Sequence, residues 1–242
     1  MVPQHQAKAR KSIRALLKAS REWRVLADSE IQVVERAVIS HKYRKGEVIF
    51  TEGDASPGIH FLKNGLVSIR KVRDRNISTL IRISRAGDTL GYRSVLAEQN
   101  HRSRAEVLAP TTSWFLKKSV MKSLMQTNQA LGFNFLKKTA TELGESHQRF
   151  HELASVRTKM RLMRLLLELH DEFGRGGTNG KLAMELPISK GDMAAMLGIR
   201  GETLSRVIRD LSEEGLVEFS GHPPATRVVF DGSLPRGAQS RH

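Results

Sequence analysis

Residues 189–211 decide the fold of the C-terminal part of the chain, and they read SKGDMAAMLGIRGETLSRVIRDL. Ser189 and Asp192 have the spacing of a capping box, with Asp in place of the usual Glu, and predict that a short helix starts after Ser189. Gly198 closes that helix. A second helix at 201–211 has one apolar face, formed by Leu204, Val207, Ile208 and Leu211. Two short helices around a tight glycine turn match the helix-turn-helix spacing.

The outward residues at the start of the second helix are Glu202, Ser205 and Arg206. In a helix-turn-helix unit these positions meet base edges in the major groove of DNA. Arg bonds both acceptors of guanine, Glu accepts from the amino group of cytosine, and Ser suits either role. The alternative for Glu202 and Arg206 is a surface salt bridge, because they are four residues apart.

The residues after the second helix predict a β-hairpin wing. Two apolar runs, 216–219 and 226–230, flank the turn sequence Ser220-Gly221-His222-Pro223-Pro224 and would place His222 and Arg227 near phosphate. Hydroxyls, cations and helix N-termini all suit phosphate contacts. The other phosphate candidates are therefore Ser189, Lys190, Arg200 and Thr203.

The N-terminal half has a different pattern. Between Tyr43 and Phe115, short apolar runs such as Val48-Ile49-Phe50 alternate with glycines, which predicts a small antiparallel barrel or jelly roll. Residues 1–20 are polar and basic without a clear apolar stripe. We expect them to form a mobile or weakly helical tail that contributes little to the fold.

A heptad pattern follows Ser119. Apolar or seam residues recur at alternating steps of three and four, at Phe133, Leu136, Ala140, Leu143, His147, Phe150 and Ala154. Gly132 and Gly144 each weaken an isolated helix by about 1 kcal/mol, so packing against a partner helix is expected to compensate. This predicts a homodimer; the alternative is burial of the seam against the chain's own barrel. His147 is expected to set the register of the seam or to be a polar core residue rather than a metal ligand.

The predicted fold class is α+β, with a β-roll, a long dimerisation helix and a winged helix-turn-helix. A helix from Val156 to Phe173, ended by Gly174, is expected to begin the last domain. The expected divisions are a tail at 1–20, a β-roll at 21–125, the dimerisation helix at 126–155, the winged domain at 156–235 and a second tail at 236–242.

Composition limits the function. Forty Lys and Arg against 25 Asp and Glu leave a formal charge of +15, which favours a polyanionic partner such as DNA, RNA or an anionic membrane surface. The chain has no cysteine, so it cannot form a cysteine-ligated iron–sulfur cluster. No apolar run is long enough to span a bilayer and no signal peptide is visible, so we expect a cytoplasmic protein without membrane attachment. Motifs of enzymes such as the P-loop are absent, and no catalytic residue or metal ligand is predicted.

Together with residues 45–54 (KGEVIFTEGD) and 58–65 (GIHFLKNG), these features resemble the cyclic-AMP receptor protein and FNR (Crp/Fnr) superfamily of bacterial transcription regulators, from about Leu26 to Phe230. The resemblance implies a cyclic-nucleotide-binding-like β-roll, double-stranded DNA as target and RNA polymerase as a further partner. The pattern Glu202-x-x-Ser205-Arg206 looks like the FNR type, which implies a palindromic operator with TTGAT-like half-sites. A β-roll regulator without DNA contact is the rival class, and the helix-turn-helix argues against it.

The resemblance leaves the effector open. The family's cyclic-nucleotide pocket matches this chain at Gly91, at Arg102-Ser103 and near Ser146, but Tyr92 replaces the family's Glu and Arg93 adds bulk and charge beside it. Haem-containing members carry their Cys and His where this chain has Gly91 and Arg93. The alternatives are a cyclic nucleotide at Tyr92, Arg102, Ser103 and Ser146; a haem on His60, His101 or His147; another small molecule; or no ligand.

Overall fold

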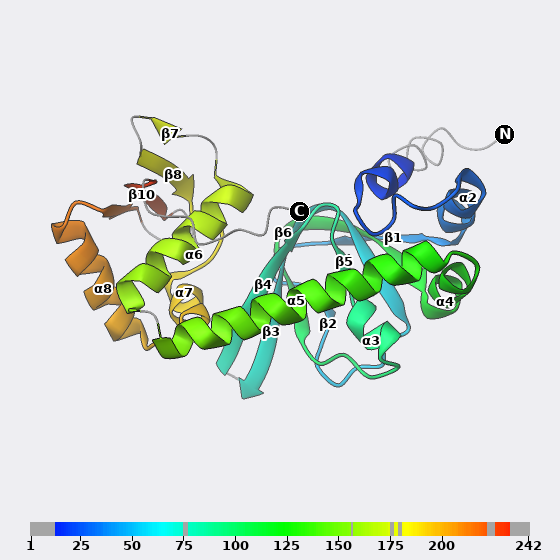
Figure 1. Cartoon of the computed structure of the whole chain (residues 1–242), viewed down its shortest axis with the longest axis horizontal. Helices are drawn as coiled ribbons and strands as arrows, with labels where there is room; N and C mark the ends of the chain where they lie inside the picture. The colour runs from blue at the N-terminus through cyan, green and yellow to red at the C-terminus, as the bar shows by residue number, and fades with distance from the viewer. Residues whose placement is uncertain are drawn as a thin grey trace. The chain divides into compact units, whose positions relative to one another are not determined.

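The computed structural model describes residues 13–74, 77–155, 157–174, 177–178, 181–221 and 226–232. The chain forms two compact units, Met1–Glu145 and Ser146–His242 (Figure 1). Each unit has its own sheet and its own helices.

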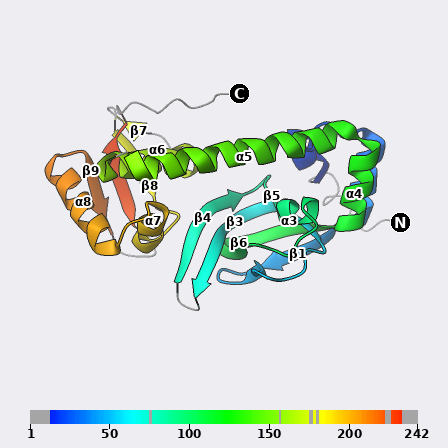
Figure 2. The same ribbon diagram turned by 60° about the horizontal axis from the view of Figure 1, so that its bottom comes forward.

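The first unit is built on an antiparallel sheet with the strand order β1-β6-β3-β4 (Figure 2). Strand β2 also pairs with β6, and β5 pairs with β3. Register shifts along β3 and β6 allow these long strands to bend into a roll. The strands are β1 (Ile39–Tyr43), β2 (Val48–Phe50), β3 (Gly58–Asp74), β4 (Ile77–Arg85), β5 (Thr89–Leu90) and β6 (Arg104–Lys117). The predicted β-roll is confirmed.

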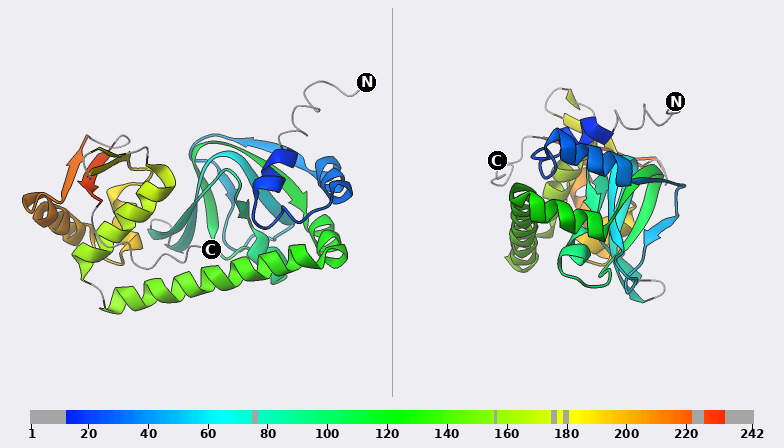
Figure 3. Two further views of the ribbon diagram at one scale, coloured as in Figure 1. Left: turned by 45° about the horizontal axis from the view of Figure 1, so that its top comes forward. Right: turned by 90° about the vertical axis from the view of Figure 1, so that its right-hand side faces the viewer.

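Helices surround this roll. Residues 13–19 are helical, and they are followed by α2 (Asp28–Ala37), α3 (Tyr92–Leu96), α4 (Lys118–Thr127) and α5 (Gln129–Ser155). Figure 3 displays the blue N-terminal helices beside the start of the green helix α5. No described helix is long and apolar enough to cross a membrane.

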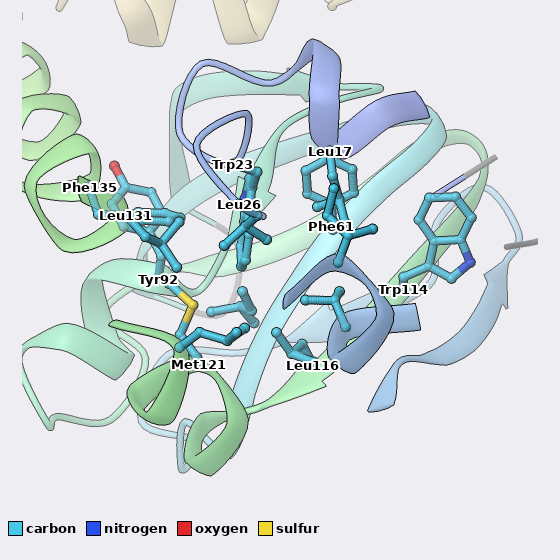
Figure 4. Packing of buried hydrophobic residues seen from close by; sticks show 14 of the residues in the cluster. Leu17, Trp23, Leu26, Phe61, Tyr92, Trp114, Leu116, Met121, Leu131 and Phe135 are labelled. Atoms are coloured by element: carbon cyan, nitrogen blue, oxygen red, sulfur yellow. The ribbon is translucent and has the colours of Figure 1, made fainter. Parts of the chain in front are cut away.

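Trp23 is the centre of the core between the roll and its helices (Figure 4). Its ring makes edge contacts with Phe61 of β3 at 6.2 Å and Phe135 of α5 at 5.5 Å between centroids. Its indole nitrogen donates a hydrogen bond to the buried hydroxyl of Thr89 at 3.0 Å. Since Phe135 also packs against Tyr92 at 5.4 Å, one aromatic cluster joins the roll, α3 and α5.

The prediction that residues 1–20 form a tail is wrong for residues 13–20. Ile13 and Leu17 are 2% and 1% exposed, and both pack into the cluster around Trp23. They lie one helical turn apart, so both point to the same side of this short helix. A stripe of so few apolar residues is too short to stand out against the surrounding charges. Residues 1–12 lie outside the described residues.

The long helix begins at Gln129, three residues later than predicted. Asn128 separates it from α4, and the Asn128 side-chain oxygen accepts a hydrogen bond from the Leu131 backbone at 3.1 Å. The Asn128 amide donates to the Glu30 carboxylate at 2.8 Å. Asn128 therefore caps α5 and also fixes its start against α2.

Helix α5 has two different faces. Leu131 and Phe135 are fully buried against the roll, and Lys138 forms an ion pair with Glu22 at 2.6 Å on the same side. The other side carries the predicted seam, whose Phe133, Leu136 and Leu143 are 66%, 63% and 56% exposed. Ala140 and His147 are also exposed, and the side chains of Phe150 and Ala154 lie outside the described residues. Burial of the seam against the chain's own barrel is therefore excluded for these five positions.

The second unit contains α6 (Thr158–Phe173), α7 (Lys190–Met196) and α8 (Gly201–Glu213) packed with a sheet of order β7-β8-β10-β9. The strands are β7 (Gly177–Thr178), β8 (Lys181–Glu185), β9 (Val217–Ser220) and β10 (Arg227–Asp231). The predicted hairpin of β9 and β10 is confirmed. Strand β8 was not predicted, and it extends the wing because it pairs with β10.

Histidines and phenylalanines alternate along one face of the roll. The ring of His60 lies 5.0 Å from Phe115 and 6.2 Å from His41, and Phe50 stacks on His101 at 3.8 Å. Burial, followed by the charges of His41 and His101, lowers the pKa of His60 to about 4. His60 is thus neutral at pH 7, and its Nδ1 lies 3.2 Å from the Ser113 hydroxyl.

This depressed pKa predicts a loss of stability in mild acid. An unfolded His titrates near pH 6.5, so between about pH 6.5 and 4 the unfolded chain binds the proton that folded His60 does not. The contribution of His60 to the free energy of unfolding is expected to fall by about 3 kcal/mol over that interval. Urea unfolding at pH 7 and pH 4.5 should therefore give a smaller pH dependence for His60→Gln than for the wild type. An unchanged pH dependence would contradict the assignment.

The buried N-terminal helix predicts a large effect of one truncation. Leu17→Ala removes most of a fully buried side chain and should lower the free energy of unfolding by about 2–5 kcal/mol. Lys18→Ala, at an exposed position beside it, should cost at most about 1 kcal/mol. Tryptophan fluorescence during urea titration measures both, because Trp23 and Trp114 lie in the same unit. If both variants unfold alike, residues 13–19 are not part of the core.

Candidate nucleic-acid interface

Helices α7 and α8 form the predicted helix-turn-helix (Figure 1). The Ser189 hydroxyl accepts from the Asp192 backbone at 3.1 Å, and the Asp192 carboxylate accepts from the Ser189 backbone at 3.3 Å. The predicted capping box is thus confirmed. Gly198 has φ = 64° in the turn, a conformation that favours glycine. The predicted inner face of α8 is buried, at Leu204, Val207, Ile208 and Leu211.

All three predicted base-reading residues lie on the exposed face of α8. Glu202, Ser205 and Arg206 are exposed, and the Ser205 hydroxyl donates to the Gly201 carbonyl at 3.0 Å. In the part of the chain that the structure describes, Glu202 and Arg206 form no ion pair with each other or with any other residue. The salt-bridge alternative is therefore not realised, and both charged groups are available to an external partner.

Arg209 belongs to the same exposed face, although sequence reasoning did not single it out. It is exposed and lies three residues after Arg206 and seven after Glu202, so it shares their side of the helix. At 1.5 Å per residue it stands about 10 Å along the axis from Glu202. The signal was present in the helical spacing, because positions 202, 205, 206 and 209 form one stripe.

The phosphate candidates have varied surroundings. Arg200 and Thr203 are exposed at the start of α8, and Arg227 is exposed on β10. Ser189 is used as the cap of α7. The Lys190 ammonium lies 5.3 Å from the centroid of Phe219, so it contacts the wing strand β9 by a cation–π interaction. His222 lies outside the described residues.

Lys159 ties α6 to the C-terminal end of α8. Its ammonium lies 2.6 Å from the Glu214 carboxylate and 3.5 Å from the Asp210 carboxylate. The hydrogen bond with Glu214 raises the pKa of Lys159. Helix α8, which carries the exposed stripe, is therefore fixed by the packing of its buried face and by the Lys159 ion pairs at its C-terminal end.

The first effector candidate, Tyr92, is part of the protein's own packing. It is buried against Phe135, and its hydroxyl donates to the carboxylate of Glu142 on α5. The guanidinium of Arg93 lies on the same carboxylate, and that of Arg82 is 3.5 Å away. Burial and then the hydrogen bond to Glu142 raise the pKa of Tyr92. Burial alone would also raise the pKa of Glu142, but the hydrogen bond from Tyr92 and the charge of Arg82 outweigh it and lower that pKa.

The other effector candidates are not gathered around Tyr92 by any described polar contact. Arg102 is exposed, and within the described ranges neither Arg102 nor Ser103 uses its side chain in a hydrogen bond or ion pair. Ser146 is exposed on α5. Of the haem candidates, His60 and His101 both pack against Phe50 in the roll, whereas His147 is exposed on α5. Among the described residues, no group of three or more potential ligands could hold a metal ion.

Two family models match the chain at the two places where the fold suggests them. A cyclic nucleotide-binding domain matches residues 40–128, and a Crp-like helix-turn-helix domain matches residues 160–226. Among characterised proteins, the chain is 24% identical over 178 residues to the electron transport regulator A of Shewanella oneidensis, covering 74% of this chain and 70% of that protein. It is 22% identical over 189 residues to the anaerobic regulatory protein of Bacillus subtilis, covering 78% and 79%.

Solved structures support the same fold. FixK2 from Bradyrhizobium japonicum superposes with a TM-score of 0.66 at 24% identity, over 80% of this chain and 92% of that chain. The c-di-GMP responsive global regulator CLP from Xanthomonas campestris superposes with a TM-score of 0.71 at 18% identity, over 86% and 100%. With both domain models matched in the order that the fold displays, the chain belongs to the Crp/Fnr superfamily of transcription regulators.

Proposed function

We propose that this protein is a homodimeric regulator that reads a palindromic operator with TTGAT-like half-sites. The observation that carries the proposal is that Glu202 and Arg206, beside Ser205 at the start of α8, are exposed and pair with none of the residues that the structure describes. An Arg in this position bonds guanine, and the Glu accepts from a cytosine amino group. Half-sites about one helical turn apart suit two such helices in a symmetric dimer. RNA polymerase is the proposed further partner, in the bacterial cytoplasm.

The roles of the remaining exposed groups follow from their chemistry. Arg200, Thr203 and Arg227 are suited to phosphate contacts, which fix the register of the protein without reading sequence. Lys190 offers its ammonium beside Phe219, and His222 belongs to the turn sequence of the wing. Ser189 would have to exchange the hydrogen bonds between its hydroxyl and Asp192 for a phosphate contact. Removing any of these contacts would weaken binding to all duplexes alike, whatever their sequence.

Helix α5 is the proposed dimer interface. Phe133, Leu136 and Leu143 are large apolar side chains that stay exposed on one stripe of a single chain. Burying such side chains removes apolar surface from water at about 25 cal/mol per Å². The heptad spacing of the stripe suits packing against α5 of a second copy of the chain, and His147 would lie in the same seam.

The Glu142 joint favours DNA binding without a cyclic nucleotide. Tyr92, Arg93 and Arg82 already hold α5 against the roll through the Glu142 carboxylate, so that joint is complete without a ligand. An effector would act only through a difference in its affinity for two states of the dimer. Cyclic nucleotide and haem regulation are the alternatives, and the titration below tests the first of them.

The reader assignment predicts a loss of sequence discrimination. Arg206→Ala should weaken binding to a TTGAT-N4-ATCAA duplex by about 1–3 kcal/mol for each half-site, while binding to a scrambled duplex changes little. Arg200→Ala should weaken both duplexes similarly and reduce the salt dependence. Fluorescence anisotropy at fixed salt measures this, with and without cyclic nucleotide. Equal losses on both duplexes in Arg206→Ala would contradict the assignment, and binding only after nucleotide addition would favour the cyclic-nucleotide alternative.

The dimer assignment predicts a change of assembly. Leu136→Glu combined with Leu143→Glu places two charges in the seam, and the protein should sediment as a monomer and lose affinity for the palindrome by at least about tenfold. Lys137→Glu on the neighbouring exposed position is the control and should remain dimeric. A dimeric double variant would exclude α5 as the interface.

A further inference from the structure

Helix α8 carries one exposed cation to which the proposed operator gives no role. Arg209 lies on the same stripe of the helix as Glu202, Ser205 and Arg206. These four positions follow the spacing i, i+3, i+4 and i+7. Homeodomains contact bases from positions with this spacing on a helix that lies in the major groove. A helix that brings Glu202 and Arg206 to base edges therefore turns Arg209 toward the same groove.

A surface ion pair, the ordinary role of such an arginine, is not formed. Glu213 is exposed four residues after Arg209, at a spacing that allows an ion pair along a helix. Within the ranges that the structure describes, Arg209 pairs neither with Glu213 nor with any other residue. The carboxylates of Asp210 and Glu214 contact Lys159 of α6. The Arg209 guanidinium is thus available to a partner outside the chain.

The packing of the second unit does not explain Arg209 either. The buried residues of α8 are Leu204, Val207, Ile208 and Leu211, and Arg209 is exposed between them. Arg206 lies three residues before Arg209, so two like charges are neighbours on one face of the helix. Such a pair slightly destabilises a helix. A nucleic acid offsets this cost, because it offers negative charge and hydrogen-bond acceptors to both guanidinium groups.

The rise of the helix indicates which base pair Arg209 reaches. TTGAT contains one G·C pair, so Arg206 and Glu202 would share that pair through its guanine and its cytosine. Arg209 stands about 4.5 Å along the axis from Arg206 and about 10 Å from Glu202. With about 3.4 Å between base pairs, these distances correspond to roughly one to three pairs. The pair that borders TTGAT is three pairs from its central G·C pair, and it is the nearest position that is free to hold a guanine.

We infer that Arg209 reads a guanine in the base pair that borders each TTGAT half-site, and so extends each half-site by one pair. This inference rests on the proposed function, since it uses the same helix in the same groove. The planar guanidinium presents parallel donors that match the two major-groove acceptors of guanine. The stripe of readers ends at Arg209, because Glu213 follows one turn later and its carboxylate is repelled by phosphates.

The test is a selection of bound duplexes from a library that keeps TTGAT-N4-ATCAA and randomises the spacer and four pairs outside each half-site. Duplexes selected by the wild type should be enriched in a G·C pair at the same bordering position of both half-sites. In anisotropy titrations, guanine at that position should strengthen binding at least about fivefold for each half-site relative to the other bases. Arg209→Ala should lose this enrichment and this difference in affinity while it still prefers TTGAT to a scrambled duplex.

The matched control is Arg227→Ala, which removes the same charge from an exposed position on the wing strand β10. As a phosphate contact, Arg227 contributes to the binding of all duplexes alike, so this variant should keep the whole preference for the bordering guanine. Circular dichroism of both variants checks that the fold is intact.

The outcomes separate this inference from the proposed function. A wild type that binds the operator without preference at the bordering pairs, or a preference that Arg209→Ala retains, would overturn the inference while the operator assignment stands. An equal loss of affinity for every bordering base in Arg209→Ala would also overturn it, because a phosphate contact behaves in that way.

If the wild type does not bind the TTGAT operator, the proposed operator is wrong and selection from a fully randomised duplex decides on Arg209. A G·C preference that disappears in Arg209→Ala and persists in Arg227→Ala would support the reading role. Identical selected sequences for the wild type and Arg209→Ala would overturn it.

Discussion

The structure depends on the two faces of helix α5, one of which packs against the roll while the other exposes large apolar side chains to solvent. One face is fixed to the roll by Phe135 against Trp23 and by the Glu142 carboxylate among Tyr92, Arg82 and Arg93. The other face leaves Phe133, Leu136 and Leu143 in water. Because the first face determines how the helix is rotated against the roll, it also determines which residues remain for a partner. The packing within one chain therefore defines the surface that we propose for the dimer.

The joint at Glu142 has consequences for regulation. The Glu142 carboxylate is partly buried and contacts a phenol and two guanidinium groups, and loss of these partners would leave a charge with little access to water. The joint thus resists rotation of α5. A ligand that acts at this point would have to replace these contacts with better ones, whereas a regulator without such a ligand keeps the joint permanently.

Sequence predicted the elements whose signals are local. Ser189 and Asp192 predict the start of α7. The buried side of α8 is predicted by the helical spacing of its apolar residues, Leu204, Val207, Ile208 and Leu211. The seam of α5 also follows from spacing alone. Each of these signals depends on neighbours within a few residues, so one sequence is sufficient to detect it.

The features that sequence missed depend on residues far apart in the chain. The burial of Ile13 and Leu17 requires Trp23, Phe61 and Trp114, which are brought together only by the sheet and its helices. The sequence alone allows Tyr92 to contact a ligand. In the structure its hydroxyl donates a hydrogen bond to Glu142, fifty residues later in the chain. Strand β8 has only five residues and is recognised by its pairing with β10. Such facts are set by topology, and local patterns carry little information about topology.

The uneven charge of the two units bears on how binding energy is divided. Residues 1–145 carry a formal charge of +13, whereas residues 146–242, with the helix-turn-helix, carry 14 Lys and Arg against 12 Asp and Glu, a formal charge of +2. The net charge of the second unit therefore adds little attraction for DNA of any sequence, and Glu202, which pairs with no described residue, repels phosphate. A carboxylate at the reading face lowers the affinity for every duplex that does not present a hydrogen-bond donor to it. Only a duplex with such a base donor at the right position offsets that loss. Discrimination is then strongest if sequence-independent attraction comes from elsewhere. The strongly basic roll unit is where this chain carries such attraction.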